Sequence, residues 1–263
     1  MGKYLAEFKF NIQASFAYRG VIILWIIVTF LQVAVLPFVW LSVYGTQDSI
    51  VGFSKSMMIT YFVLIPCIDV LVQSWADFEI KDDIKEGRLN TFLIKPINYL
   101  LRVFWVENGW KVSRPFIVIL IVLLLYPFIH TYFQLSLHAR LVWILPAIIA
   151  SRFLNFLISS IIGMAAFWTV RSNWALQIWW ALQTLAAGYV APLSFYPPNI
   201  QKIISYTPFP MLLQTPINII LDNISTEQIV RQLLLASLWI IILLIISNFL
   251  WKKGVRKTEG IGM

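Results

Sequence analysis

The chain has 263 residues, of which 60% are hydrophobic and only 12% are charged, and its formal net charge is +8. A soluble domain has about twice this charged fraction, so the composition excludes a soluble globular protein. It predicts an all-α polytopic membrane protein, residues 1–263 as a single domain, with six transmembrane helices of about 20 residues each.

The first predicted element is an amphipathic helix over residues 3–19, which lies in the plane of the lipid headgroups. Large apolar side chains recur along it at roughly fourfold spacing: Tyr4, Leu5, Phe8, Ile12 and Phe16. Two apolar segments follow, residues 21–44 and 57–75, and each is long enough to cross a bilayer. They are predicted as the first and second spans.

Residues 77–114 form the longest charged segment of the chain and are predicted to lie in water. Five acids and bases occur there within seven residues: Asp82, Asp83, Lys85, Glu86 and Arg88. After Gly87, the spacing predicts a short helix, ended by Pro96, with one apolar face: Leu89, Phe92 and Leu93. This stretch is either a solvated loop with one helical turn or a docking surface for a soluble partner. Residues 99–114 are predicted as an interfacial helix that leads into the third span.

Four further spans and a tail complete the predicted membrane domain: residues 115–132, 141–170, 174–195 and 233–251, then 252–263. A tight turn at Arg171–Asn173 separates two of these spans. Residues 196–230 are apolar but broken by prolines, which leave helical pieces too short to cross a bilayer. They predict an outer re-entrant or surface-lying hairpin. The alternative, a seventh span, is opposed by the prolines and by the charge distribution.

The distribution of lysine and arginine predicts the orientation. With a cytosolic amino terminus, 15 of the 20 basic residues lie in cytosolic segments, and four lie outside: Lys55, Arg140, Lys202 and Arg231. The positive-inside rule therefore places both termini and residues 77–114 in the cytosol. Because the bases lie at span ends, they predict contact with membrane lipids and exclude nucleic acid as a partner.

The chain carries no motif of an enzyme active site. It has no G-x-x-x-x-G-K-[ST] loop for nucleotide phosphates, and neither His130 nor His138 has a convincing third metal ligand or triad partner. The single Cys67 lies inside a span, so an intrachain disulfide is excluded. Asp69 is the only acid within a predicted span and Arg152 the only base. Ionisable residues inside a membrane commonly have a function. For Asp69 and Arg152 the favoured interpretation is polar contact inside the protein, without a role in substrate binding.

The charged segment also contains an ordered set of residues: Glu86, Gly87, Arg88, Leu89, Leu93, Ile94, Lys95 and Pro96. This set resembles the segment after the second membrane helix in type-2 ABC exporter permeases, with Phe92 in place of a leucine. The resemblance implies a cytosolic coupling helix that docks into a cleft on a separate ATPase subunit, which binds ATP and Mg²⁺. It also implies that residues 3–19 are the family's elbow helix.

A second set of residues lies downstream: Phe167, Trp168, Thr169, Gly188, Pro192–Pro197, Pro208 and Phe209. It resembles the fifth-helix and outer-loop region of the same family. The likeness is best to a six-helix subfamily, some of whose members resemble drug and viologen exporters. It implies an outer gate at four residues: Pro192, Pro197, Pro208 and Phe209.

Together these features predict the permease subunit of an ATP-driven exporter in a bacterial plasma membrane. The resemblance implies two permease subunits, identical or homologous, with one ATPase beneath each, and a hydrophobic or amphipathic substrate. Two other classes stay open. A membrane-embedded lipid-modifying enzyme needs a polar catalytic cluster, and an ATP-independent transporter or channel usually shows inverted repeats or several midplane charges.

Overall fold

The computed structural model describes residues 2–17, 19–133, 135–169 and 173–259, and within these it is almost entirely helical. The all-α prediction is confirmed, apart from one hairpin of two-residue strands in which Ser49 pairs with Ser54. The elements are α1 (Gly2–Ala17), α2 (Arg19–Tyr44), β1 (Ser49–Ile50), β2 (Phe53–Ser54), α3 (Lys55–Val72), α4 (Ala76–Lys85), α5 (Leu89–Leu93), α6 (Tyr99–Lys111), α7 (Arg114–Ile129), η1 (Ala139–Trp143), α8 (Ile144–Met164), η2 (Ala165–Phe167), α9 (Asn173–Ala186), η3 (Leu193–Phe195), α10 (Pro198–Ser205), α11 (Phe209–Leu212), α12 (Gln214–Ile220) and α13 (Thr226–Glu259).

Several helical stretches have the length and apolar character of membrane spans. In the described part of the chain there are five: Ile22–Tyr44, Lys55–Val72, Tyr99–Ile129, Ala139–Phe167 and Thr226–Lys257. The chain is therefore a multi-pass membrane protein, as its composition predicted.

The structure differs from the prediction at residues 174–195, where no helix is long enough to be a candidate span. The described residues therefore contain five candidate spans and not the predicted six. Here α9 has 14 residues and ends at Ala186, which is about 21 Å of helix against a hydrocarbon core of about 30 Å. Gly188 follows with a φ of +95°, a conformation that favours glycine and ends a helix. Its carbonyl accepts a hydrogen bond of 2.8 Å from the Tyr61 hydroxyl. Of the predicted turn before α9, Arg171 and Ser172 lie outside the described residues, as does Val170.

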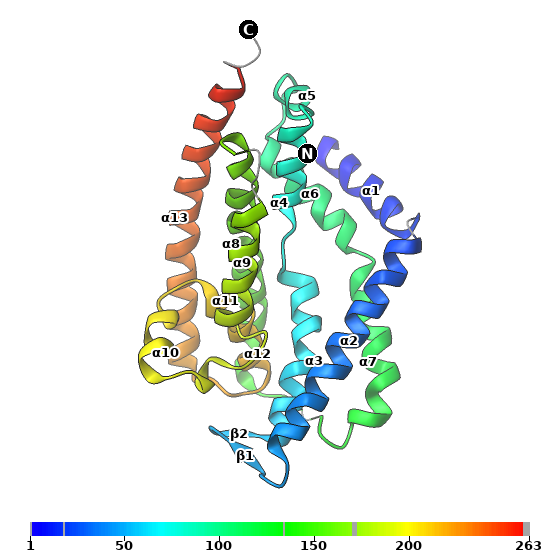
Figure 1. Ribbon diagram of the computed structural model, residues 1–263, viewed down its shortest axis with the longest axis vertical. Helices are drawn as coiled ribbons and strands as arrows, with labels where there is room; N and C mark the ends of the chain where they lie inside the picture. Colours follow the sequence, from blue (N-terminus) through cyan, green and yellow to red (C-terminus); the bar gives the residue numbers. More distant parts are fainter. Residues whose placement is uncertain (1, 18, 134, 170–172, 260–263) are drawn as a thin grey trace.

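The helices form two groups around α3 (Figure 1). On one side α2 and α7 pack against α3, and on the other α8 packs against α3 and carries α13 along its length. The main core lies where α3, α8 and the α11–α12 segment meet, and its fully buried side chains include Met58, Tyr61, Leu154, Leu212 and Leu213. This arrangement makes α3 the element that touches both groups.

The start of α1, the α5 segment and the end of α13 lie at one end of the molecule, whereas β1, β2 and α10 lie at the other (Figure 1). The last helix extends well beyond the predicted span 233–251, because α13 has 34 residues. It begins with a capping box: the Gln228 side chain accepts the Ser225 N–H at 3.0 Å, and the Ser225 hydroxyl oxygen accepts the Gln228 N–H at 3.3 Å.

Candidate functional site

The α4–α5 tip, defined as residues 82–96, projects from one end of the molecule (Figure 1). The chain leaves α4 through Gly87, whose φ of +72° favours glycine and turns the backbone sharply. α5 then occupies Leu89–Leu93, and the chain continues through Pro96 to α6. The tip therefore combines the sequence-predicted residues Glu86 to Pro96 in one compact turn.

The apolar side chains of the tip do not share one exposed face. Leu89 is 1% exposed and belongs to a core cluster with Ile80 and Tyr99. The Phe92 ring lies 3.9 Å from the Arg102 guanidinium carbon. By contrast, Leu93 is 36% and Ile94 is 86% exposed. The predicted face of Leu89, Phe92 and Leu93 is therefore split, and Leu93 with Ile94 forms the outward apolar surface.

Ion pairs attach the tip to the helices beneath it. Asp83 is 2% exposed and accepts hydrogen bonds of 2.8 Å from both Arg88 Nε and the Tyr99 hydroxyl. Arg88 also pairs with Glu86. Arg102 on α6 lies 3.6 Å from Asp83 and within 3.4 Å of a carboxylate on each of α4 and α1, Glu79 and Glu7. These contacts link the tip to α4, α6 and α1.

A break in the helix separates α3 from α4 at residues 73–75, which are the last three residues of the predicted second span. The free backbone groups at this break are taken up by side chains. The backbone N–H of Trp75 donates to Glu107 Oε1 at 2.8 Å, and Arg152 Nη1 donates to the backbone carbonyl of Gln73 at 3.1 Å. The Ser74 hydroxyl also donates to Glu107, at Oε2, over 3.0 Å. α6 and α8 thus hold the break from two sides.

Glu107 is the centre of this arrangement. Its carboxylate is 9% exposed, accepts a hydrogen bond of 2.9 Å from Arg152 Nη2 and lies 3.3 Å from Lys111 Nζ. Arg152 therefore pairs with Glu107 and not with Asp69 among the described residues. The sequence interpretation missed Glu107 because it treated residues 99–114 only as an interfacial helix, although an acid four residues before Lys111 is a pairing signal.

A second polar contact joins α4 to α8 just beyond the break. Ser159 donates to Asp77 Oδ1 at 2.6 Å, and the Asp77 backbone N–H donates to the Ser159 hydroxyl oxygen at 2.9 Å. The other carboxylate oxygen of Asp77 is buried and has no hydrogen-bond partner among the described residues. Burial raises the pKa of the Asp77 carboxyl from 3.8 to about 6.

We expect the stability of the folded protein to fall between about pH 4 and pH 6 by up to roughly 3 kcal/mol, and we expect Asp77→Asn to remove this dependence. The folded-state pKa, about 6, lies above the ordinary value of 3.8. The folded state is therefore favoured when Asp77 is protonated, so this contribution is complete below pH 4 and lost as the pH rises through 6. Thermal unfolding of the purified protein from pH 4 to 7 measures it, with Asp82→Asn, on the exposed side of α4, as the control. If the stability of the wild type and of Asp77→Asn changed with pH by the same amount, the prediction would be contradicted.

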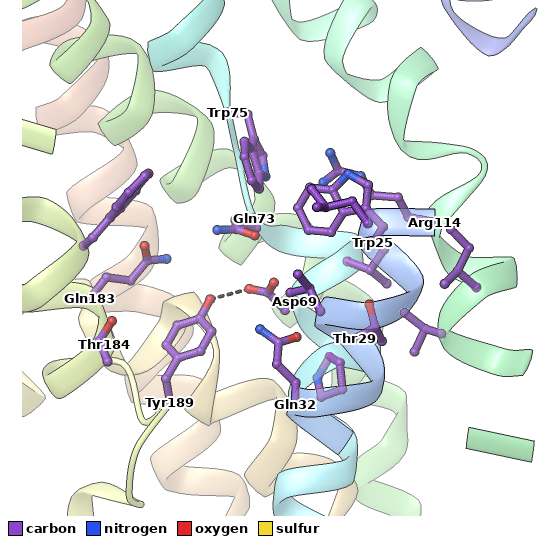
Figure 2. Close-up of a pocket in the computed structure, with 17 residues that line it drawn as sticks. Trp25, Thr29, Gln32, Asp69, Gln73, Trp75, Arg114, Gln183, Thr184 and Tyr189 are labelled. Atoms are coloured by element: carbon purple, nitrogen blue, oxygen red, sulfur yellow. Dashed lines mark hydrogen bonds between the residues drawn. The ribbon is translucent and has the colours of Figure 1, made fainter. Parts of the chain in front are cut away.

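A cavity of about 560 Å³, the central cavity, lies between α2, α3 and α7 on one side and α9 with Tyr189 on the other (Figure 2). Asp69 points into it and accepts a hydrogen bond from the Tyr189 hydroxyl. Arg114 lies 4.0 Å from the centre of the Trp25 ring. The remaining lining is a mixture of amide, hydroxyl and aromatic side chains, among them Thr29, Gln32, Gln73, Trp75, Trp180, Gln183 and Thr184.

This lining suits a molecule with both polar and apolar parts, because its hydrogen-bonding groups lie among indole and aliphatic side chains, the latter including Leu24, Val28 and Ile117. The sequence indicated Asp69 as an interior polar residue but not Tyr189 or Gln183. Their signal was weak, since a tyrosine after a glycine and a glutamine in an apolar helix are common. The sequence did not show whether Asp69 and Arg152 pair with each other. In the structure they have different partners, Tyr189 for Asp69 and Glu107 for Arg152.

The four residues predicted as an outer gate lie at the starts of three short helices. Pro192, Pro197 and Pro208 directly precede η3, α10 and α11, and Phe209 begins α11 with its ring 5.6 Å from that of Trp179. α11 packs on α8, where the Ser151 hydroxyl donates to the Leu212 carbonyl at 2.6 Å. With eight, four and seven residues, α10, α11 and α12 are each too short to cross a bilayer.

Within the described ranges, no three His, Cys, Asp or Glu side chains are arranged to hold a metal ion. His138 lies 2.9 Å from Asp222, which Arg140 also contacts at 2.7 Å. His130 Nδ1 lies 2.9 Å from the Pro127 carbonyl oxygen. Both histidines thus take part in local contacts near the end of the molecule that carries β1 and β2.

Comparison with known proteins identifies the family. No curated protein matches the chain. Residues 23–262, however, match the model of a family described as ABC-2 family transporter protein, which is nearly the whole chain. Permeases of this family typically lack a nucleotide-binding domain and act with ABC ATPase subunits. The chain therefore belongs to the ABC-2 family of transporter proteins, and it is a transmembrane permease of an ABC transporter.

Proposed function

We propose that this permease is the membrane subunit of an ABC exporter that moves a hydrophobic or amphipathic substrate out of a bacterial cell. The observation that carries the proposal is the α4–α5 tip. Its outward surface, Leu93 and Ile94, is apolar and exposed, whereas Leu89 and Asp83 fix the same turn to the rest of the protein. An exposed apolar surface on a rigidly held turn suits a cleft on a soluble partner.

The partner is an ABC ATPase, with one copy beneath each of two permease subunits, identical or homologous. The ATPase binds ATP and Mg²⁺, and the permease supplies the coupling helix with Glu86, Gly87, Arg88, Leu89, Phe92, Leu93 and Pro96. In this arrangement Leu93 and Ile94 contact the ATPase cleft. Leu89, Phe92 and Asp83 keep the coupling helix attached to α4 and α6.

The contacts described above offer a continuous route from the tip to the central cavity. Movement of the tip acts on α4, and α4 is joined through the break at residues 73–75 to α3, which carries Asp69. Glu107 and Arg152 tie the break to α6 and α8. The central cavity then forms part of the transport path, with Asp69, Tyr189 and the surrounding amides as its polar contacts.

The orientation with both termini in the cytosol is supported by two observations. The basic residues gather in the segments that lie near the tip, as the positive-inside rule requires, and the described ends of the chain lie at the same end of the molecule as α5 (Figure 1). α1 then serves as an elbow helix at the cytosolic interface. The segment of α10 to α12, with Pro192, Pro197, Pro208 and Phe209, closes the outer end of the path.

The experiment that tests the proposal is co-purification of the tagged permease with its ABC ATPase from membranes, followed by ATP hydrolysis of the complex in nanodiscs. We expect a stable complex with ATPase activity that depends on the permease. A permease that retains no ATPase, or an ATPase whose activity is the same without the permease, would overturn the proposed function.

A further inference from the structure

A second cavity lies at the end of the molecule opposite the tip, where α10, α12 and the start of α13 come together (Figure 1). Its volume is about 430 Å³, which is within the range of about 300–1,000 Å³ that small-molecule sites occupy. We call it the outer pocket. It is separate from the central cavity, since the two share no lining residue.

Each of the three helices presents a polar face to the outer pocket. The lining residues lie on one side of each helix, because they are separated by three or four residues or are adjacent to one that is. They are Gln201, Lys202 and Ser205 on α10, Gln214 and Asn218 on α12, and Gln228 and Arg231 on α13. Three polar faces turned toward one space are unusual in a chain that is 60% hydrophobic. The pattern indicates a site built for a polar ligand.

The charge of the outer pocket is positive. Lys202 and Arg231 line it, and no aspartate or glutamate does. Neither cation forms an ion pair or a side-chain hydrogen bond within the ranges that the structure describes. Glu227 lies one helical turn before Arg231 on α13, but it does not line the outer pocket and forms no ion pair within the described ranges. Asp222 is already paired with Arg140 at 2.7 Å and His138 at 2.9 Å. An anionic group is therefore the ligand whose charge the pocket complements.

Two buried polar atoms add hydroxyl recognition. Ser194 Oγ and Asn218 Oδ1 are both buried, belong to residues that line the outer pocket, and lack a hydrogen-bond partner in the described part of the chain. Leaving such atoms unpaired costs about 1–3 kcal/mol each. Rotation of each side chain toward the outer pocket lets a ligand with hydroxyl groups satisfy both, because a hydroxyl donates to the asparagine oxygen and accepts from the serine.

The opposite face of α10 indicates where this ligand is found. Ile200 and Ile203 are exposed on that side, so α10 is an amphipathic helix with apolar side chains turned away from the outer pocket. Such a helix lies at a membrane surface with its apolar face toward acyl chains. We propose that the outer pocket binds the phosphoglycerol headgroup of an anionic lipid in the leaflet at this end of the protein. The phosphate pairs with Lys202 and Arg231, and the glycerol hydroxyls meet Ser194 and Asn218.

The test is binding of a fluorescent phosphatidylglycerol to the full-length permease in detergent micelles. We expect Lys202→Gln and Arg231→Gln each to weaken binding about tenfold, because each removes one charge-assisted contact to phosphate. Ser194→Ala should leave the binding of phosphatidic acid unchanged and weaken only that of phosphatidylglycerol. The matched control is Lys55→Gln, an equal charge change at the same end of the molecule but outside the outer pocket.

Circular dichroism and thermal unfolding without lipid should be unchanged for Lys202→Gln and Arg231→Gln, since both side chains are exposed. Ser194→Ala should be at least as stable as the wild type, because it removes a buried hydroxyl without a partner. Equal loss of binding in Lys55→Gln would show general charge attraction and overturn the site. Unchanged binding in the Lys202→Gln/Arg231→Gln double variant would do so as well. Competition by free glycerol phosphate at the concentration at which the lipid competes would overturn the lipid assignment in favour of a soluble phosphate ester.

Discussion

Replacement of Ile94 by aspartate is expected to weaken the association of the permease with its ATPase by well over tenfold. Ile94 is 86% exposed in the isolated permease, and burying an isoleucine or leucine side chain in a partner's cleft contributes about 1.5–3 kcal/mol. A buried aspartate without a partner adds a desolvation cost. Leu93→Asp should have a similar effect, whereas folding and membrane insertion should be unchanged because neither residue supports the core. Co-purification and ATP hydrolysis in nanodiscs measure both variants.

The control is Leu137→Asp, an equally drastic change at a fully exposed leucine toward the opposite end of the molecule. Leu89→Asp is not a suitable test, since Leu89 is buried in the permease and its loss would disturb the fold. If Ile94→Asp and Leu93→Asp both retained full ATPase association and activity, the tip would be an ordinary solvated turn. The proposed function would then lose its main support.

Glu107→Gln is expected to destabilise the permease by about 3–5 kcal/mol, which is the typical cost of removing one partner from a buried ion pair. The amide would leave Arg152 and Lys111 buried without a counter-charge. Thermal unfolding and the yield of monodisperse protein on size exclusion measure the effect. The matched control is Glu7→Gln, whose carboxylate is partly exposed and lies 3.4 Å from Arg102. It should cost less than about 1 kcal/mol.

A third variant keeps this prediction testable if Glu107→Gln does not accumulate. In Glu107→Gln/Arg152→Met/Lys111→Met both cations are replaced by apolar side chains of similar length, and stability should largely return. A single Glu107→Gln variant as stable as Glu7→Gln would show that the ion network does not support the break at residues 73–75.

The sequence predicted the coarse architecture because that depends on local properties. Long apolar runs are visible in composition, and the structure confirms an all-helical, multi-pass protein. Prolines likewise indicated that residues 196–230 are broken into short helices. The structure has three short helices there, α10, α11 and α12, but residues 226–230 already belong to the long helix α13. The 14-residue length of α9 was not predicted, because it depends on Gly188 and on a hydrogen bond from Tyr61, which lies 127 positions earlier in the chain. An apolar run alone does not show where a helix within it ends.

The candidate sites were predicted less completely, since they depend on which side of a short element faces the protein. Helical spacing grouped Leu89 with Leu93, but α5 has a single turn and packs Leu89 inward against Tyr99. Ile94 lies just past the end of α5 and so had no periodic partner. Glu107 and Tyr189 contact residues on distant helices, and no spacing rule in one sequence predicts such contacts.

The short break between α3 and α4 gives the permease a mechanical property. α4 has ten residues and is about 15 Å long, so it acts as a lever arm whose fulcrum is the segment at Gln73–Trp75. A rotation of about 10° at this fulcrum corresponds to about 2.6 Å of travel at the far end of α4 for an arm of this length. In the proposed exporter, a displacement of a few ångströms at the ATPase would become a small rotation next to Asp69.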